Sequence, residues 1–369
     1  MVQSADVIVI GGGIAGASAA SELASDRKVV LLEMEDRPGY HTTGRSAAMF
    51  VPTYGPPLIM AITRASADFF HNTPEGFADT PILSPRGELM LVQPGEEEEA
   101  EKARAMGLKD ISMEKGKALI QLLRTDRLVA LLLDEAAQSI DVDVLHQGFL
   151  RRFRQRGGTL TCDAEVTRLG RSNGTWRAET KQGAFEAPVV VNASGAWADI
   201  VAGRAGVRPC GLTPKRRSAA LLSMPVDISR WPLTFGAGET FYFKPMGGKL
   251  MLSPADVTPV EPHDAWADDM LLAEAIERFQ NVIDHEVTHI DHTWGGLRTF
   301  SPDGELVVGF DPEAQGFFWL AGQGGYGIQT SPAASRLAGA LIRGAGVPAD
   351  LVSEGITAAA LSPARFAAA

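Results

Sequence analysis

The 369-residue sequence predicts an α/β fold with a Rossmann-like domain and a second, smaller domain. At roughly 150 residues per domain, this length corresponds to about two domains. Val7–Ile10 is a short apolar run typical of a buried parallel strand, and it leads directly into a cluster of glycines and a helix of small residues. The 39 glycines form more than a tenth of the chain, against about 7% on average. They are clustered without a Gly-X-Y period, which excludes collagen and indicates backbone that passes close to a ligand.

The predicted elements begin with a strand–helix–strand unit. A strand over 6–10, a helix over 17–24 and a strand over 28–32 make up about 30 residues, the usual size of a βαβ motif. Residues 36–57 are rich in Gly, Pro, Thr and Ser and are expected to form a long loop. Further helices are expected over 58–70, from 96, and over 142–156, 269–279 and 333–343. Further strands are expected over 88–92, 159–162, 164–169, 184–191, 306–309 and 316–320, with a hairpin over 242–254.

The composition excludes several classes of function. With 34 basic and 45 acidic residues the net charge is −11, which argues against nucleic acid or an anionic membrane as a partner. The uncharged stretch Val7–Ser21 follows Asp6 rather than a basic segment and is too short to span a membrane. Cys162 and Cys210 have no CxxC or zinc-site spacing, which indicates a reducing compartment. We therefore expect a cytoplasmic protein without integral membrane contact.

A glycine fingerprint follows the first strand. Gly11, Gly13 and Gly16 match G-x-G-x-x-G, and Glu33 lies 22 positions after the first of them, at the end of the second strand. In this context the first glycine permits a tight turn, the second lets the backbone approach a pyrophosphate, and the third lets helix and sheet pack closely. The carboxylate of Glu33 can accept both ribose hydroxyls and disfavours a 2′-phosphate. The pattern predicts FAD or NAD.

Three further clusters of small residues lie far apart in the chain, at 39–48, 189–199 and 322–331. One glycine turn is enough for a pyrophosphate. Clusters this widely dispersed suit a larger ligand threaded through the fold, which favours FAD.

Several segments carry a resemblance over nearly the whole chain, from Val7 to about Pro363. They include GYHTTGRSAA (39–48), PKRRSA (214–219), FYFKP (241–245), HTWGGLR (292–298) and GQGGYGIQTS (322–331). The sequence resembles the D-amino-acid oxidase (DAO) superfamily of FAD-dependent oxidoreductases, and within it most closely the D-arginine dehydrogenases. The resemblance implies a glutathione-reductase-type FAD-binding domain and a substrate domain with a mixed antiparallel sheet and flanking helices. We expect the first domain to comprise 1–49, 145–212 and 295–369, and the second to comprise 50–144 and 213–294.

The resemblance implies noncovalent FAD, because relatives with covalent flavin use a cysteine and neither cysteine here lies in a matching segment. A helix after the last glycine cluster would present its N-terminus to the flavin and stabilise the charge of the reduced form. The expected cofactor-binding residues are Gly11, Gly13, Ile14, Ala15, Gly16, Glu33, Met34, Thr42, Thr43, Gly44, Arg45, Ser46, Ala47, Ala48, Val166, Ser194, Gly195, Trp197, Gly324, Tyr326, Gly327, Ile328 and Thr330.

Two arginines are the main candidates for substrate binding. The guanidinium group matches a carboxylate bidentately, and the resemblance implies that Arg217 and Arg298 hold the substrate α-carboxylate over the flavin. It also implies that Tyr54 and Tyr242 line the pocket. A single arginine or tyrosine would more often be structural, so these roles depend on the family match.

Other pocket residues bear on specificity. The resemblance implies that Glu88 faces a cationic substrate side chain, and that Gly325 and Gln329 complete the pocket. The D-arginine dehydrogenases have His and Thr where this chain has Met49 and Val51. Both differences make the pocket more apolar and favour uncharged or hydrophobic D-amino acids, whereas Glu88 favours cationic ones.

The function implied is oxidation of a D-amino acid by hydride transfer from its α-carbon to flavin N5. The resulting imine would be hydrolysed to a 2-oxo acid and ammonia, and an unidentified electron acceptor would reoxidise the flavin. Three alternatives stay open: oxidation of a secondary amine (glycine- or sarcosine-like) or a 2-hydroxy acid on the same fold, a non-enzymatic flavin-binding protein, and an NAD-dependent dehydrogenase.

A zinc motif competes with this interpretation. The segment from His285 to His289 reads H-E-V-T-H, which binds zinc when a helix brings the two histidines together. Its β-branched residues favour a strand instead, on which the histidines would lie about 13 Å apart. We expect no metal site.

Overall fold

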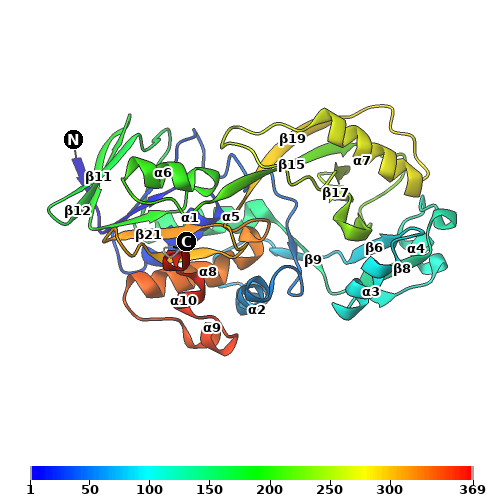
Figure 1. The fold of residues 1–369 in the computed structure, drawn as a ribbon, viewed down its shortest axis with the longest axis horizontal. Coiled ribbons are helices and arrows are strands. Elements are labelled where there is room, and N and C mark those ends of the chain that lie inside the picture. The colour runs from blue at the N-terminus through cyan, green and yellow to red at the C-terminus, as the bar shows by residue number, and fades with distance from the viewer. Residues whose placement is uncertain (1, 367–369) are drawn as a thin grey trace.

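The computed structural model describes residues 2–366, which form two halves (Figure 1). Both ends of the chain lie in the half that contains α1 and β21, and the long strands β15 (Thr213–Leu222) and β19 (His292–Phe300) extend from it toward the other half. No helix within residues 2–366 has the length and apolar character needed to cross a membrane.

A six-stranded sheet forms the centre of the first half. Its order is β10 (Thr159–Thr161), β3 (Val29–Leu32), β2 (Val7–Ile10), β14 (Val189–Asn192), β21 (Phe317–Ala321) and β20 (Val307–Phe310). All neighbours pair in parallel except β20 and β21, which are antiparallel. Every residue of β2 and β3 is buried, as a sheet covered on both faces requires.

Alternate residues of the central strands enter two different cores. Val7 and Val9 pack with the helices on one face, whereas Ile8 and Ile10 pack with a second sheet on the other. The helices are α1 (Ile14–Leu23), α2 (Pro57–His71), α5 (Val142–Gln155), α8 (Gly327–Ile342), α9 (Ala349–Ser353) and α10 (Ala358–Leu361), followed by the turn η4 (Pro363–Phe366). The second sheet has the order β1 (Val2–Ser4), β13 (Gly183–Ala187), β12 (Thr175–Thr180) and β11 (Arg168–Ser172), beside η2 (Gly195–Trp197) and α6 (Ala198–Arg204).

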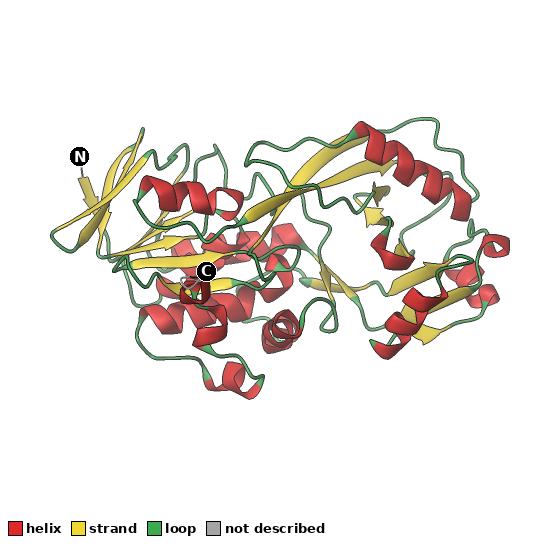
Figure 2. Cartoon of the chain, in the orientation of Figure 1, coloured by secondary structure: helices red, strands yellow, loops and turns green. Residues whose placement is uncertain are grey.

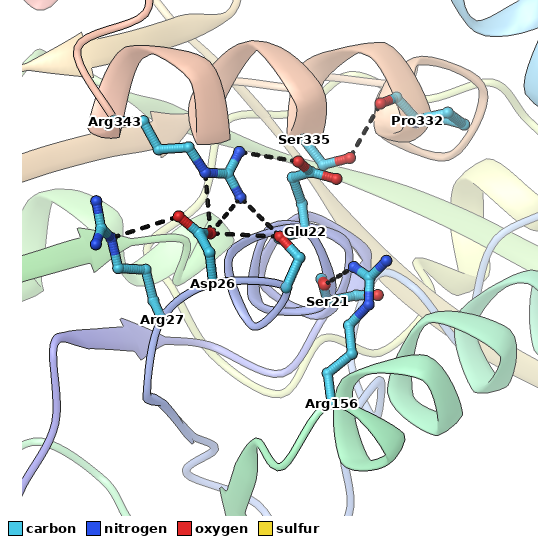
Figure 3. Close-up of polar contacts among 9 residues, drawn as sticks. Ser21, Glu22, Asp26, Arg27, Arg156, Pro332, Ser335 and Arg343 are labelled. Atoms are coloured by element: carbon cyan, nitrogen blue, oxygen red, sulfur yellow. Dashed lines mark hydrogen bonds and ion pairs between the residues drawn. The ribbon is translucent and has the colours of Figure 1, made fainter.

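Polar contacts fasten the end of α8 to the end of α1 (Figure 3). Arg343 pairs with Glu22 at 3.0 Å and with Asp26 at 2.8 Å, and Arg156 donates to the carbonyl oxygen of Ser21 at 2.6 Å. These contacts join α1, α5 and α8 at the ends of α1 and α8 remote from the glycine turn.

The second half is built on an eight-stranded mixed sheet (Figure 2). Its order is β19, β15, β18 (Lys249–Ser253), β17 (Tyr242–Met246), β16 (Leu233–Gly236), β6 (Glu88–Val92), β8 (Ala130–Asp134) and β7 (Lys109–Asp110). Around it lie α3 (Glu97–Ala105), α4 (Met113–Leu119), α7 (Asp269–Val282), η1 (Thr125–Arg127) and η3 (Ala237–Glu239). A small sheet of β4 (Met49–Phe50), β9 (Gln138–Ile140) and β5 (Leu83–Pro85) lies between the halves.

The predicted α/β class with a Rossmann-like domain and a mixed-sheet domain is confirmed, and several boundaries differ. The strand expected over 184–191 is two strands, because Pro188 cannot donate to a ladder. The strand expected over 164–169 begins only at Arg168, and the expected loop 36–57 contains β4. The helix expected from 333 begins at Gly327, and it accommodates Pro332 in its first turns. The domain boundaries stay a prediction.

Candidate functional site

Two adjoining cavities lie between the sheets, and the same seven residues line both of them. One, the long cavity, runs past the glycine turn and the adjoining loops. The other, the side cavity, extends toward α3 and η3. The residues common to both are Ser46, Ala47, Arg217, Tyr242, Arg298, Gly325 and Ile328.

Most of the predicted cofactor residues line the long cavity. They are Gly11, Gly13, Ile14, Ala15, Glu33, Met34, Thr42, Thr43, Arg45, Ser46, Ala47, Val166, Ser194, Gly195, Trp197, Gly324, Gly327 and Ile328. Ala48 lines the side cavity, as do all the predicted substrate residues: Met49, Val51, Tyr54, Glu88, Arg217, Tyr242, Arg298, Gly325 and Gln329. The structure thus brings together residues from ten separate stretches of sequence.

Four predicted cofactor residues line neither cavity, and each has a packing role instead. A Cβ on Gly16 would lie 1.8 Å from the carbonyl oxygen of Gly11, and a Cβ on Gly44 would lie 2.6 Å from that of Gly39. Tyr326 packs its ring 5.3 Å from that of Tyr54. The hydroxyl of Thr330 donates to the carbonyl oxygen of Tyr326 at 2.9 Å.

The glycine turn aims the start of α1 at the long cavity. Gly11 has φ +104°, and a Cβ there would lie 2.5 Å from the carbonyl oxygen of Ala193, so only glycine fits. Gly13 precedes the helix and supplies no side-chain cap, while Ile14 N donates to the hydroxyl of Thr43 at 2.9 Å. Apart from the Ile14 amide, the N–H groups of the first turn have no side-chain cap, and such a helix N-terminus is a binding site for phosphate.

Glu33 lies under this turn and is 6% exposed. One carboxylate oxygen accepts from Gly12 N at 2.7 Å, and the other accepts from Glu35 N at 3.0 Å. Burial raises the pKa of Glu33, against the effect of these backbone donors. Each oxygen keeps a second acceptor site, so the carboxylate can still accept from a ribose.

Arg45 lines the long cavity, but its guanidinium is directed elsewhere. It forms an ion pair with Asp264 and donates to the carbonyl oxygens of Ala265 and Gly295, both at 2.9 Å. Tyr40 donates to the same carboxylate at 3.0 Å. Arg45 therefore joins the loop before β4 to the loop before α7, rather than directing its charge at a phosphate.

Arg217 and Arg298 lie where the two cavities meet. Arg217 pairs with Gly296 across β15 and β19, so Arg298, two residues further, lies on the same face of the sheet. Neither guanidinium forms a hydrogen bond or ion pair with any residue among 2–366, although Arg217 lies 5.7 Å from the ring centre of Tyr242. Arg217 Nε is buried without a partner, and burial followed by the charge of Arg298 lowers the pKa of Arg217. Two close cations without a counter-ion form a site for an anion.

Gly325 keeps the space around this pair open. A Cβ at this position would lie 3.0 Å from a terminal nitrogen of Arg298. The glycine therefore lets the backbone run close along the guanidinium group.

Gln329 supplies a second unsatisfied donor in the side cavity. Its oxygen accepts from Val51 N at 3.1 Å, whereas its amide nitrogen is buried without a partner. Within residues 2–366 only four buried side-chain polar atoms lack a partner, and two of them belong to Arg217 and Gln329. This concentration indicates a polar ligand.

Tyr54 and Glu239 both line the side cavity. Glu239 was not among the residues expected from the sequence. The tyrosine hydroxyl donates to the Glu239 carboxylate at 3.4 Å. Burial, with a contribution from Glu239, raises the pKa of Tyr54, so its hydroxyl stays protonated. Glu239 has φ +54° and follows Gly238 at φ +68°, and this Gly-Glu turn before a strand was the only available sequence signal.

Glu88 begins β6 and is 9% exposed. It forms no hydrogen bond or ion pair with the residues that the structure describes. Burial, followed by the charges of Asp134 and Glu239, raises the pKa of Glu88 to about 7. Its charge therefore changes near neutral pH.

The two histidines of the zinc motif lie in an irregular segment. Residues 285–290 are irregular, so the expected strand is wrong, and β19 begins only at His292. No group of three or more His, Cys, Asp or Glu residues within 2–366 is placed to hold a metal ion.

The long cavity fits the expected FAD. It contains a helix N-terminus behind a glycine turn, a buried carboxylate at the end of β3, and two arginines at its far end that form no ion pair within residues 2–366. These features match a pyrophosphate, a ribose and the region of the flavin where substrate binds. Cys162 and Cys210 line neither cavity.

Comparison with known proteins supports the same conclusion. Residues 6–341 match the family model DAO, described as FAD dependent oxidoreductase. Glycine oxidase of Geobacillus kaustophilus is 26% identical over 384 residues, which cover 98% of this chain and 97% of that protein. Human mitochondrial dimethylglycine dehydrogenase is 25% identical, and the match covers 88% of this chain but 41% of that protein.

The fold is also found in solved structures. L-proline dehydrogenase from P. horikoshii superposes with a TM-score of 0.82 at 21% identity, covering 100% of this chain and 99% of that one. This similarity shows the fold, and the family match shows that FAD is the cofactor. The chain belongs to the DAO family of FAD-dependent oxidoreductases.

Proposed function

We propose that the protein catalyses oxidative deamination of a D-amino acid, giving a 2-oxo acid and ammonia. The observation that carries this proposal is the pair Arg217 and Arg298, two guanidiniums at the junction of the cavities that form no ion pair within residues 2–366. The planar guanidinium fork suits the α-carboxylate of an amino acid. Bound FAD, held noncovalently, supplies the hydride acceptor. The D configuration rests on the resemblance of the segments around these arginines to D-arginine dehydrogenases.

In this proposal the residues of the side cavity mainly bind and orient the substrate. The arginine pair clamps the carboxylate, Tyr54 and Tyr242 flank it, and Gln329 offers its free amide N–H. Positive charge beside the substrate lowers the pKa of its ammonium group and favours the neutral amine that oxidation requires. No separate base is needed, so catalysis is positioning plus electrostatics. The substrate loses a hydride from Cα and a proton from nitrogen, and water hydrolyses the resulting imine.

The side cavity favours a substrate with a long side chain. Beyond the arginine pair its lining is largely apolar: Met49, Val51, Met90, Ala103, Met106, Leu108, Leu233 and Phe235. Glu88 is the most deeply buried of the acidic residues in this lining. Since its pKa lies near 7, we expect apolar D-amino acids to be accepted when Glu88 is protonated.

Oxidation of a secondary amine or a 2-hydroxy acid is the nearest alternative. Both kinds of substrate carry the carboxylate that the arginine pair would bind, and glycine oxidase is among the relatives. Glycine and sarcosine, however, would leave the apolar part of the side cavity unfilled.

Steady-state kinetics on a panel of substrates tests the proposal. We expect higher kcat/KM for D-methionine and D-phenylalanine than for glycine, sarcosine, D-lactate or L-amino acids. A strong preference for D-arginine over D-methionine and D-phenylalanine would contradict the assignment of an apolar side-chain site.

A further inference from the structure

His146 contacts the glycine turn from below, although it lines neither cavity. It lies in the second turn of α5 and is 3% exposed. Its Nε2 atom is 2.8 Å from the carbonyl oxygen of Gly12. Because a carbonyl oxygen only accepts, Nε2 carries the hydrogen and donates it.

The peptide groups on both sides of Gly12 are thereby fixed by buried side chains. Gly12 N donates to Glu33 at 2.7 Å, and Gly12 O accepts from His146. Gly12 is the residue between the tight turn at Gly11 and the helix cap at Gly13. Its orientation determines where the next N–H groups point, and these are the groups that bind a pyrophosphate.

The same imidazole also packs against a second segment of the long cavity, the loop that contains Gly39 and Thr43. A Cβ on Gly39 would lie 2.8 Å from His146 Cε1, so the ring packs directly against the backbone of Gly39. Gly39 lines the long cavity and accepts from Gly44 N at 2.8 Å, which closes the loop that carries Thr43. Thr43 in turn accepts from Ile14 N. One side chain therefore contacts both backbone segments that form the phosphate end of the cavity.

We propose that His146 is a positioning residue for FAD binding, which acts by holding the Gly12 peptide and the Gly39 loop in their ligand-binding arrangement. It does not itself contact the cofactor. Burial lowers the pKa of His146, so the ring is neutral and its single N–H is committed to Gly12. This inference concerns the cofactor alone and is independent of the substrate.

The rate of FAD release from the holoenzyme tests this inference. His146→Phe keeps a ring and removes the donor, leaving a buried carbonyl unpaired, and we expect FAD release to be about 5- to 100-fold faster. His146→Gln can place its amide nitrogen near the position of Nε2, and we expect release within about threefold of wild type. Release from His146→Phe at the wild-type rate would overturn the proposal.

A control separates positioning from a general loss of stability. Trp231 is a buried donor whose Nε1 binds Gln121 at 2.9 Å in the core of the other half. Trp231→Phe should lower the melting temperature and leave FAD release unchanged, whereas equal acceleration in both variants would overturn the proposal. If His146→Phe does not fold, His146→Asn replaces it, since its shorter amide does not reach Gly12. We then expect FAD to be released faster from His146→Asn than from His146→Gln. Equal rates would overturn the proposed positioning role of His146.

Discussion

Arg217 and Arg298 lie on the same face of two neighbouring antiparallel strands, and neither guanidinium has an acidic partner within residues 2–366. Placing two like charges together without a counter-ion costs stability, and a protein keeps such an arrangement where a ligand compensates it. The two cavities meet at this pair. The pair therefore marks the point where an anionic substrate would meet the cofactor.

Replacement of Arg298 should lower the activity of the enzyme without lowering its stability. We expect Arg298→Met to lower kcat/KM for the best D-amino acid by at least about 100-fold, because two charge-assisted hydrogen bonds are lost. We also expect an equal or higher melting temperature, since repulsion from Arg217 is relieved. Lys215→Met is the matched control: this residue opposes Arg298 on the sheet but lines neither cavity. A normal kcat/KM in Arg298→Met would remove the arginine from substrate binding.

Glu88 should make substrate preference depend on pH. Its pKa of about 7 means that the carboxyl is mostly neutral below that pH and mostly charged above it. The ratio of kcat/KM for D-arginine to that for D-methionine should therefore rise about tenfold between pH 6 and pH 8.5. In Glu88→Gln the ratio should stay flat, and a wild-type pH dependence in that variant would refute the role of Glu88.

The raised pKa of Glu88 should also make the stability of the protein depend on pH. The pKa of this acid is higher in the folded protein than the usual 4.5, so the folded state binds more protons between those values. The contribution of Glu88 to stability then falls as the pH rises from about 4.5 through 7. Glu88→Gln should raise the melting temperature by a few degrees at pH 8 and have little effect at pH 4.5. Equal shifts at both pH values would show that the carboxyl is not the cause.

The sequence identified the residues that line the cavities better than it predicted the sheets that support them. The glycine turn is a local pattern, so Gly11, Gly13 and Glu33 could be identified from spacing alone. The arginine pair depends on the long-range pairing of β15 with β19, which no local pattern specifies. Family resemblance supplied what periodicity could not.

The residues missed by the sequence act through tertiary contacts. His146 was part of an ordinary amphipathic helix, and its function depends on a carbonyl group 134 residues away. Asp264 lies in the loop before α7 and meets Arg45 only in the fold. Glu239 was similarly hidden in a short turn before β17.

The Arg45–Asp264 contact should slow cofactor release. It joins two loops beside the long cavity, and the Asp264 side chain is more than half exposed, so we expect a modest, salt-dependent effect. Asp264→Asn should release FAD about 2- to 10-fold faster at low ionic strength, with a smaller difference at high salt. Asp284→Asn, which breaks the exposed pair with Arg124, is the control and should leave release unchanged. A salt-independent effect, or none, would refute the electrostatic role.

His146 should make the holoenzyme sensitive to acid. Because burial lowers the pKa of this base below 6.5, the unfolded chain binds a proton more readily than the folded one. Its contribution to stability is therefore complete above about pH 6.5 and is lost as the pH falls through that value and below. The melting temperature of wild type should fall more steeply between pH 7 and pH 5 than that of His146→Gln. Parallel slopes would show that His146 does not titrate in this range.

Anaerobic reduction of the bound flavin tests the central claim most directly. The purified holoenzyme is mixed without oxygen with D-methionine, L-methionine, sarcosine, glycine or D-lactate, and the flavin absorbance is followed. The proposed function predicts rapid bleaching by D-methionine, little or none by the other compounds, and loss of bleaching in Arg298→Met. Bleaching by sarcosine, glycine or D-lactate but not by D-methionine would contradict it.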